Sequence, residues 1–115
     1  MARVVPRLKL AWFDTAEVDG FAGTLIAELV RRMPPGELSA SDEKSDKRFR
    51  RMTEVLSDRA RAFGMAQRPN VYQRARLGNR VKWALKDAGY PQAFIDAFTY
   101  ELVRVVTLAA KSPRA

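Results

Sequence analysis

Apolar side chains recur at helical spacing between residues 18 and 33, and this regularity constrains the fold more than any other feature. Because they lie three or four residues apart, they form one continuous stripe on a helix: Val18, Phe21, Ala22, Leu25, Ile26, Leu29, Val30 and Met33. Asp14 and Glu17 have the spacing of a capping box, which predicts that the helix begins at Asp14. The sequence Pro34-Pro35-Gly36 predicts its end.

A second helix is predicted after a polar linker at residues 34–45. It begins at Ser41 or Ser45 and runs to Phe63, with Gly64 as the residue that ends it in a left-handed conformation. Its buried stripe consists of Phe49, Met52, Leu56, Ala60 and Phe63. The charges on its outer side are spaced so that they satisfy one another, which is typical of a solvated surface.

The third helix has clear signals at both ends. Asn70 is a suitable N-cap because its side chain can accept a hydrogen bond from the backbone N–H of Gln73. Gly89 suits the left-handed position after the last turn, and Tyr90 is predicted to fold back on Leu85 in a Schellman arrangement.

The fourth helix, with Pro91 in its first turn and its end near Ala110, is the most apolar of the chain. Its apolar arc covers about 240° of the helical wheel, whereas a surface helix needs only about 100°. This helix is therefore either central in the bundle or part of an oligomer interface. Glu101 lies within the arc, and burial there would require a basic partner such as Arg48, Arg59 or Arg104. A catalytic role for Glu101 would require a second titratable group nearby.

Residues 1–13 are predicted to form an extended arm or a short strand. Residues 7–12 alternate in polarity, with Leu8, Leu10 and Trp12 on one side. No second strand is indicated elsewhere, and a lone strand leaves backbone groups unpaired. The segment therefore either pairs with its own copy in a dimer or lies over the helices as an arm.

Together these patterns predict an all-α fold, a compact bundle of about four helices with an extended N-terminal arm. The 115 residues fit a single domain, 1–115. The first helix also carries a ridge of small residues, which is either plain exposed surface or a contact for another helix: Ala16, Gly20, Gly23 and Ala27. This ridge, the lone strand and the broad apolar arc favour a homodimer.

The composition excludes several chemistries. There is no cysteine and no histidine, so disulfides, thiolate or imidazole metal sites and Ser-His-Asp triads are ruled out. No phosphate-binding glycine loop and no acidic calcium loop is present. We therefore expect a protein that is not an enzyme and that has no metal and no cofactor.

No segment has the unbroken apolar run of a signal peptide or a membrane span. Arg7 and Lys9 interrupt the N-terminal run. Asp96, Glu101 and Arg104 interrupt the apolar segment at residues 94–110. We therefore expect a cytoplasmic protein without a membrane partner.

The net charge of +8 is concentrated in the middle of the chain. Residues 44–86 contain 13 basic and 3 acidic side chains. Such a section indicates a surface for an anionic partner, either nucleic acid or an acidic protein. The alternative is a compositional bias, since arginine outnumbers lysine 15 to 6 and a GC-rich coding sequence raises arginine without any such contact.

One side of the third helix combines large aromatic rings with cations: Tyr72, Arg76, Asn79, Arg80, Trp83 and Lys86. Bases stack on aromatic rings while guanidinium groups meet phosphates, so this surface suits single-stranded nucleic acid. Trp, Tyr and Arg are also the preferred anchors of protein interfaces. Alternatively, the N-terminal arm or the second helix covers Tyr72 and Trp83.

On these grounds we expect the protein to bind nucleic acid through the third helix. The alternative is an adaptor or accessory subunit that binds an acidic protein through the same residues. A helix-turn-helix reading of the third and fourth helices is rejected, because the second helix of that motif presents polar residues to DNA and the fourth helix is apolar.

Overall fold

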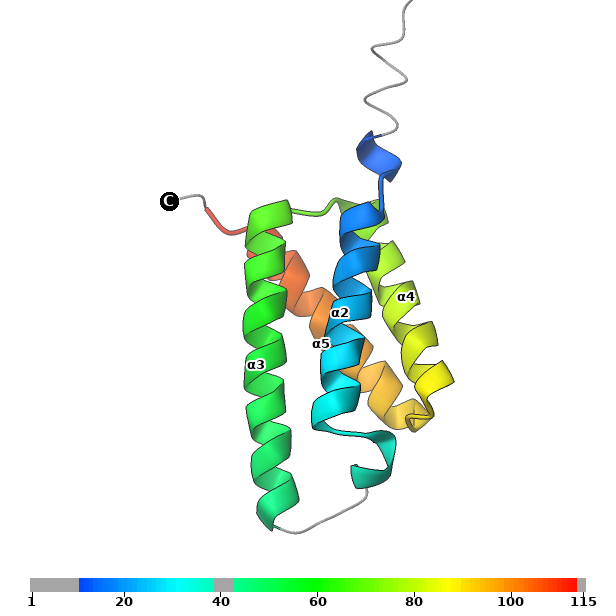
Figure 1. Ribbon diagram of the computed structural model, residues 1–115. Coiled ribbons are helices and arrows are strands. Elements are labelled where there is room, and N and C mark those ends of the chain that lie inside the picture. Colours follow the sequence, from blue (N-terminus) through cyan, green and yellow to red (C-terminus); the bar gives the residue numbers. More distant parts are fainter. Residues whose placement is uncertain (1–10, 39–42, 114–115) are drawn as a thin grey trace, which may run out of the picture.

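The computed structural model describes residues 11–38 and 43–113, and within them the protein is an all-α bundle (Figure 1). Its long helices are α2 (Ala16–Arg32), α3 (Glu43–Gln67), α4 (Val71–Ala88) and α5 (Gln92–Ala110). A short 3-10 helix, η1 (Pro35–Glu37), follows α2, and the described ranges contain no strand. The predicted fold class is confirmed.

The helices pair in an order that differs from the order of the chain. The main interfaces join α3 to α5, α2 to α4 and α4 to α5, with a smaller one between α2 and α3. Consecutive helices run in opposite directions, and α5 crosses diagonally behind α2 towards the C-terminal end of α3 (Figure 1). The parallel pairs α2–α4 and α3–α5 therefore lie side by side.

All four helices contribute to one hydrophobic core. Its largest fully buried side chains are Leu25, Leu29, Met52, Leu77, Val81, Leu85, Ile95 and Val106. Burying a side chain of this size contributes roughly 1.5–3 kcal/mol. The stripe predicted at residues 18–33 faces this core, with Phe21 and Val30 at its half-buried margins.

Both ends of α4 form as the sequence predicts. The Asn70 side chain accepts a hydrogen bond from the Gln73 N–H at 2.8 Å, and the Gln73 side chain accepts one from the Asn70 N–H at 2.8 Å. At the other end, Gly89 has φ 93° and the Tyr90 N–H donates to the Leu85 carbonyl at 3.1 Å. Burial raises the pKa of Tyr90.

The predicted end of α3 at Gly64 is wrong. The helix continues to Gln67, and Arg68, with φ 44°, is the residue in the left-handed conformation. Gly64 instead lies where α3 and α5 touch, since a Cβ there would be 2.8 Å from the Ala109 Cβ and 2.8 Å from the Val106 carbonyl oxygen. The absence of a side chain at Gly64 permits this close approach.

The start of α2 also differs from the prediction. The helix begins after Thr15, and Asp14 accepts a hydrogen bond from the Ala16 N–H at 3.0 Å without forming a capping box. The Gln73 amide of α4 donates to the Asp14 carbonyl at 2.8 Å, so a tertiary contact contributes to fixing this end. Residues 11–13 form a helical turn rather than an extended segment, while the rest of the predicted strand lies outside the described residues.

The broad apolar arc of α5 is only partly buried. Its core side chains are Ile95, Leu102, Val106 and Ala109, but Tyr100 and Leu108 are exposed. The expected burial of Glu101 is not found, because this carboxylate is exposed and pairs with Arg104 at 2.9 Å. Among the described helices, none is long and apolar enough to cross a membrane.

Candidate functional site

The outward side of α4 carries the predicted site residues. Leu77, Val81 and Leu85 are buried in the core, which turns the opposite side of the helix towards solvent. We call this surface the α4 face; it comprises the six predicted residues and Lys82: Tyr72, Arg76, Asn79, Arg80, Lys82, Trp83 and Lys86. Trp83 is 54% exposed and Tyr72 is 41% exposed, so α3, the second helix of the sequence prediction, does not cover these two rings.

Arg76 is engaged within the protein. Its guanidinium donates two hydrogen bonds to the Asp19 carboxylate of α2, at 3.0 and 3.2 Å. Arg80 lies 3.6 Å from the same carboxylate. The hydrogen bond from Arg76 lowers the pKa of Asp19, and Asp19 raises the pKa of Arg76. The α4 face therefore has one cation fewer for an external anion than the sequence suggests.

Two aromatic residues before α2 extend the α4 face at its N-terminal end. Phe13 packs edge-on against Tyr72, with 5.0 Å between the ring centroids. The Asn70 side chain donates to the Trp12 carbonyl at 3.0 Å, and the Trp12 ring is exposed. Sequence reasoning missed both residues because their position depends on contacts across nearly 60 residues of chain.

The other end of the α4 face contains a small hollow beside Trp83. It has a volume of about 40 Å³ and is lined by Lys82, Trp83, Lys86, Gln92 and Ile95. The Lys86 ammonium lies 5.2 Å from the centroid of the Trp83 ring, in a cation–π contact. Lys82 was not among the predicted residues because it lies at the margin of the helical wheel, yet it lines the same hollow as Trp83.

These contacts define what the α4 face can do chemically. It offers flat, exposed rings for stacking, and Arg80, Lys82 and Lys86 as exposed cations for phosphate or carboxylate groups. No ion pair within the described residues occupies Lys82 or Lys86. The face therefore suits binding of an anion that carries flat, apolar groups.

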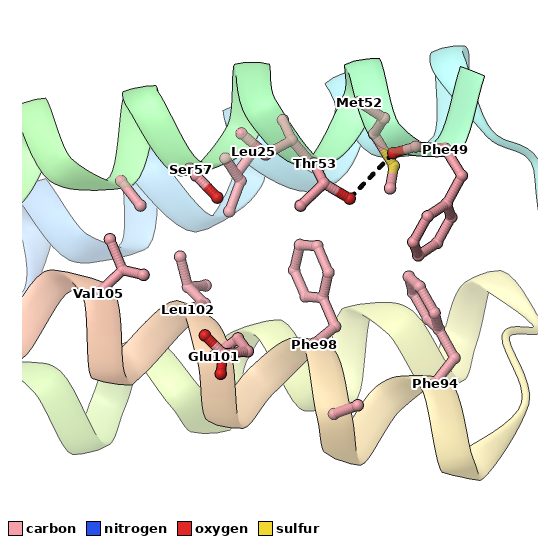
Figure 2. Close-up of a pocket in the computed structure, with 13 residues that line it drawn as sticks. Leu25, Phe49, Met52, Thr53, Ser57, Phe94, Phe98, Glu101, Leu102 and Val105 are labelled. Atoms are coloured by element: carbon pink, nitrogen blue, oxygen red, sulfur yellow. Dashed lines mark hydrogen bonds between the residues drawn. The ribbon is translucent and has the colours of Figure 1, made fainter. Parts of the chain in front are cut away.

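A second candidate site is an apolar groove between α3 and α5. It has a volume of about 270 Å³, and Leu25 of α2 also lines it. Figure 2 shows Phe49 of α3 and Phe94 and Phe98 of α5 pointing into the space between the two helices. Among the described residues, Glu101 is the only one with a charged side chain that lines this groove.

The shape of the groove follows from the register of the two parallel helices. Gly64 meets Ala109 at one end, and Phe49 lies near Phe94 at the other, so facing residues differ by 45 in number (Figure 2). Small residues close the first end, and large rings hold the helices apart at the second. The groove therefore opens towards the N-terminal ends of α3 and α5, and no local pattern in the sequence indicates this register.

Among the described residues that line the groove, none offers Glu101 a second titratable group of the kind that acid–base catalysis needs. Thr53 and Ser57 are the polar neighbours of Glu101 in the groove, and the Thr53 hydroxyl donates to the Phe49 carbonyl at 2.9 Å. No cluster of three acidic residues that could hold a metal occurs in the part of the chain described here.

Comparison of the chain with protein-family models, with curated proteins and with solved structures finds no match.

Proposed function

We propose that the protein is a non-enzymatic binding protein for single-stranded nucleic acid and that the α4 face is its binding surface. The observation that carries this proposal is the environment of Trp83, which is more than half exposed, lies in cation–π contact with Lys86 and lines a hollow together with Lys82. A base stacked on such a ring contributes about 1–3 kcal/mol, and the neighbouring cations meet the phosphates.

The number of cations available to phosphate groups determines the electrostatic contribution to the binding affinity. If Arg80, Lys82 and Lys86 each neutralise one phosphate, the affinity falls about 20-fold between about 50 and 200 mM salt. Arg76 is excluded from this count because its guanidinium donates two hydrogen bonds to the Asp19 carboxylate. Arg80 is counted because it lies farther from that carboxylate, at 3.6 Å, and about half of its side chain is exposed.

A polarisation titration of labelled single-stranded RNA and DNA tests this proposal. The double variant Lys82→Ala/Lys86→Ala should weaken binding and reduce the salt effect to about threefold. The matched control is Lys44→Ala/Lys47→Ala, which removes the same charge from the exposed start of α3 and should leave the salt effect unchanged. Binding that is absent at low salt, or equally weakened by both variants, would contradict the proposal.

A second candidate function is binding of an acidic protein through the same face. The Asp19–Arg76 pair favours it, because an interface that already contains an internal acid is less suited to a densely charged polymer. This function predicts a partner that is lost with Trp83→Ala and retained after nuclease treatment. A cytoplasmic location and a homodimer also remain proposals.

A further inference from the structure

The exposed side of α5 and the groove beside it form one continuous apolar surface. Leu108 is 56% exposed and Tyr100 is 69% exposed, and Ala93 and Ala97 are also exposed on the outer side of the helix. Within the described residues nothing covers these side chains. Phe49, at the open end of the groove, is 40% exposed.

The charges around this surface are nearly balanced, in contrast to those of α4. The acidic and basic side chains that border the groove on α3 and α5 show no basic excess: Glu43, Asp46, Glu54, Asp58 and Glu101 against Lys47, Arg50, Arg61 and Arg104. Two of the acids are already paired, Asp58 with Arg61 at 3.1 Å and Glu101 with Arg104 at 2.9 Å. On α4, five basic residues stand against the single acid Asp87.

This balance identifies the occupant of the surface. Two copies of a chain with net charge +8 repel each other at most orientations. They can approach closely where the surface has no excess of positive charge and apolar area can be buried. The outer side of α5 forms a ridge, and the groove runs parallel to this ridge. When two copies are related by a two-fold axis, the ridge of each copy can fit into the groove of the other.

We propose that two copies of the chain associate through this surface, with α5 antiparallel to α5 of the other copy and the two-fold axis near Glu101. Leu108 and Phe94 each lie seven residues from Glu101, about 10 Å along the helix. The partner's Leu108 therefore reaches the open end of the groove, between Phe49 and Phe94. Arg104 of each copy remains close enough to neutralise the two glutamates at the axis. The α4 faces remain free.

The absence of cysteine allows a direct test of this arrangement. In Glu101→Cys the only thiol lies at the two-fold axis, so mild oxidation should give a disulfide-linked dimer. Glu17→Cys is the control, because residue 17 is exposed on α2, outside this surface. Crosslinking of Glu17→Cys to the same extent would overturn the proposal, and so would failure of Glu101→Cys to crosslink.

Sedimentation equilibrium of the unmodified chain gives an independent readout. Because the interface is apolar and has no excess of positive charge, the dimer should persist or strengthen when salt is raised. Leu108→Glu should weaken dimerisation by about 30-fold or more, and its circular-dichroism melt should match the parent because Leu108 is exposed. A monomer at near-millimolar concentration, or a dimer that Leu108→Glu leaves intact, would overturn the proposal.

Discussion

Asp19 joins two helices and also neutralises part of the basic surface. Its carboxylate accepts two hydrogen bonds from Arg76 and one from the Thr15 hydroxyl at 3.1 Å. These contacts lower its pKa in the folded protein. A lowered folded-state pKa adds stability above the ordinary value of 3.8, and that stability is lost as the pH falls through the folded-state value.

The variant Asp19→Asn should therefore be less stable at neutral pH, by about 1 kcal/mol, since Arg76 is partly exposed and the pair is screened. The difference from the parent should shrink as the pH falls below about 4, where Asp19 of the unfolded chain becomes protonated, and it should vanish below the lowered pKa of Asp19 in the folded protein. Urea unfolding at several pH values measures it. A difference that is constant down to pH 2 would show that the ion pair does not stabilise the fold.

The same substitution should strengthen nucleic-acid binding, because it releases Arg76. With four free cations, the loss of affinity between about 50 and 200 mM salt should rise from about 20-fold to about 50-fold. The polarisation titration measures how the affinity of the parent and of Asp19→Asn depends on the salt concentration. An equal salt dependence of the parent and the variant would exclude Arg76 from the binding surface.

Gly64 should tolerate no side chain. In Gly64→Ala the new Cβ would meet Ala109 and the Val106 carbonyl at 2.8 Å, so α3 and α5 must separate, at a cost of about 1–3 kcal/mol. Gly23→Ala is the matched control, because nothing lies within 4 Å of its Cβ. Alanine has the higher helix propensity, so this control should gain up to about 1 kcal/mol. Thermal melts that rank the two variants in the reverse order would contradict the close helix contact.

At the scale of helices, the start of α4 serves two purposes that can be separated. Asn70 caps the helix through its side-chain oxygen and binds the Trp12 carbonyl through its amide nitrogen. Asn70→Ala removes both contacts and should cost about 1 kcal/mol or more. Asn70→Asp keeps the cap acceptor and loses only the donor to Trp12. Nearly parental stability of Asn70→Asp, together with destabilisation of Asn70→Ala, is the expected outcome in urea unfolding.

The helices and their local ends could be predicted from the sequence because their causes are local. The cap at Asn70 and the turn at Gly89 depend only on residues within one or two helical turns. Gly64 was misassigned because its partner is 45 residues away, and nothing nearby distinguishes a terminating glycine from a packing glycine. The capping box at Asp14 failed because α4 contacts that segment.

In the candidate site, too, the features with local causes could be predicted and those that depend on distant contacts could not. Helical periodicity placed Tyr72, Trp83 and their neighbours on one side of α4, and Trp83 is exposed. The engagement of Arg76 by Asp19 could not be predicted, since the two residues are 57 apart and belong to different helices. The groove depends on the register of α3 against α5, which no single helix encodes.

For the whole molecule, the two surfaces should respond to salt in opposite ways. Nucleic-acid binding at the α4 face depends on cations and should weaken as salt rises. Association through α5 buries apolar area without an excess of positive charge and should not weaken, because salt screens the repulsion between copies. Sedimentation and polarisation over the same salt series measure both. If nucleic-acid binding and dimerisation both weakened as salt rises, the claim that they use separate surfaces would be contradicted.

The most direct test of the central claim is the fluorescence of Trp83 during binding. The variant Trp12→Phe leaves Trp83 as the only tryptophan, and Trp12 is exposed, so the fold should be retained. Titration with a single-stranded oligonucleotide should quench this fluorescence to a plateau, at the concentration where polarisation of the labelled strand also saturates, because bases stack on the ring. Fluorescence that stays unchanged while the strand binds would contradict the assignment of Trp83 as the stacking residue. No binding at low salt would contradict the proposed function itself.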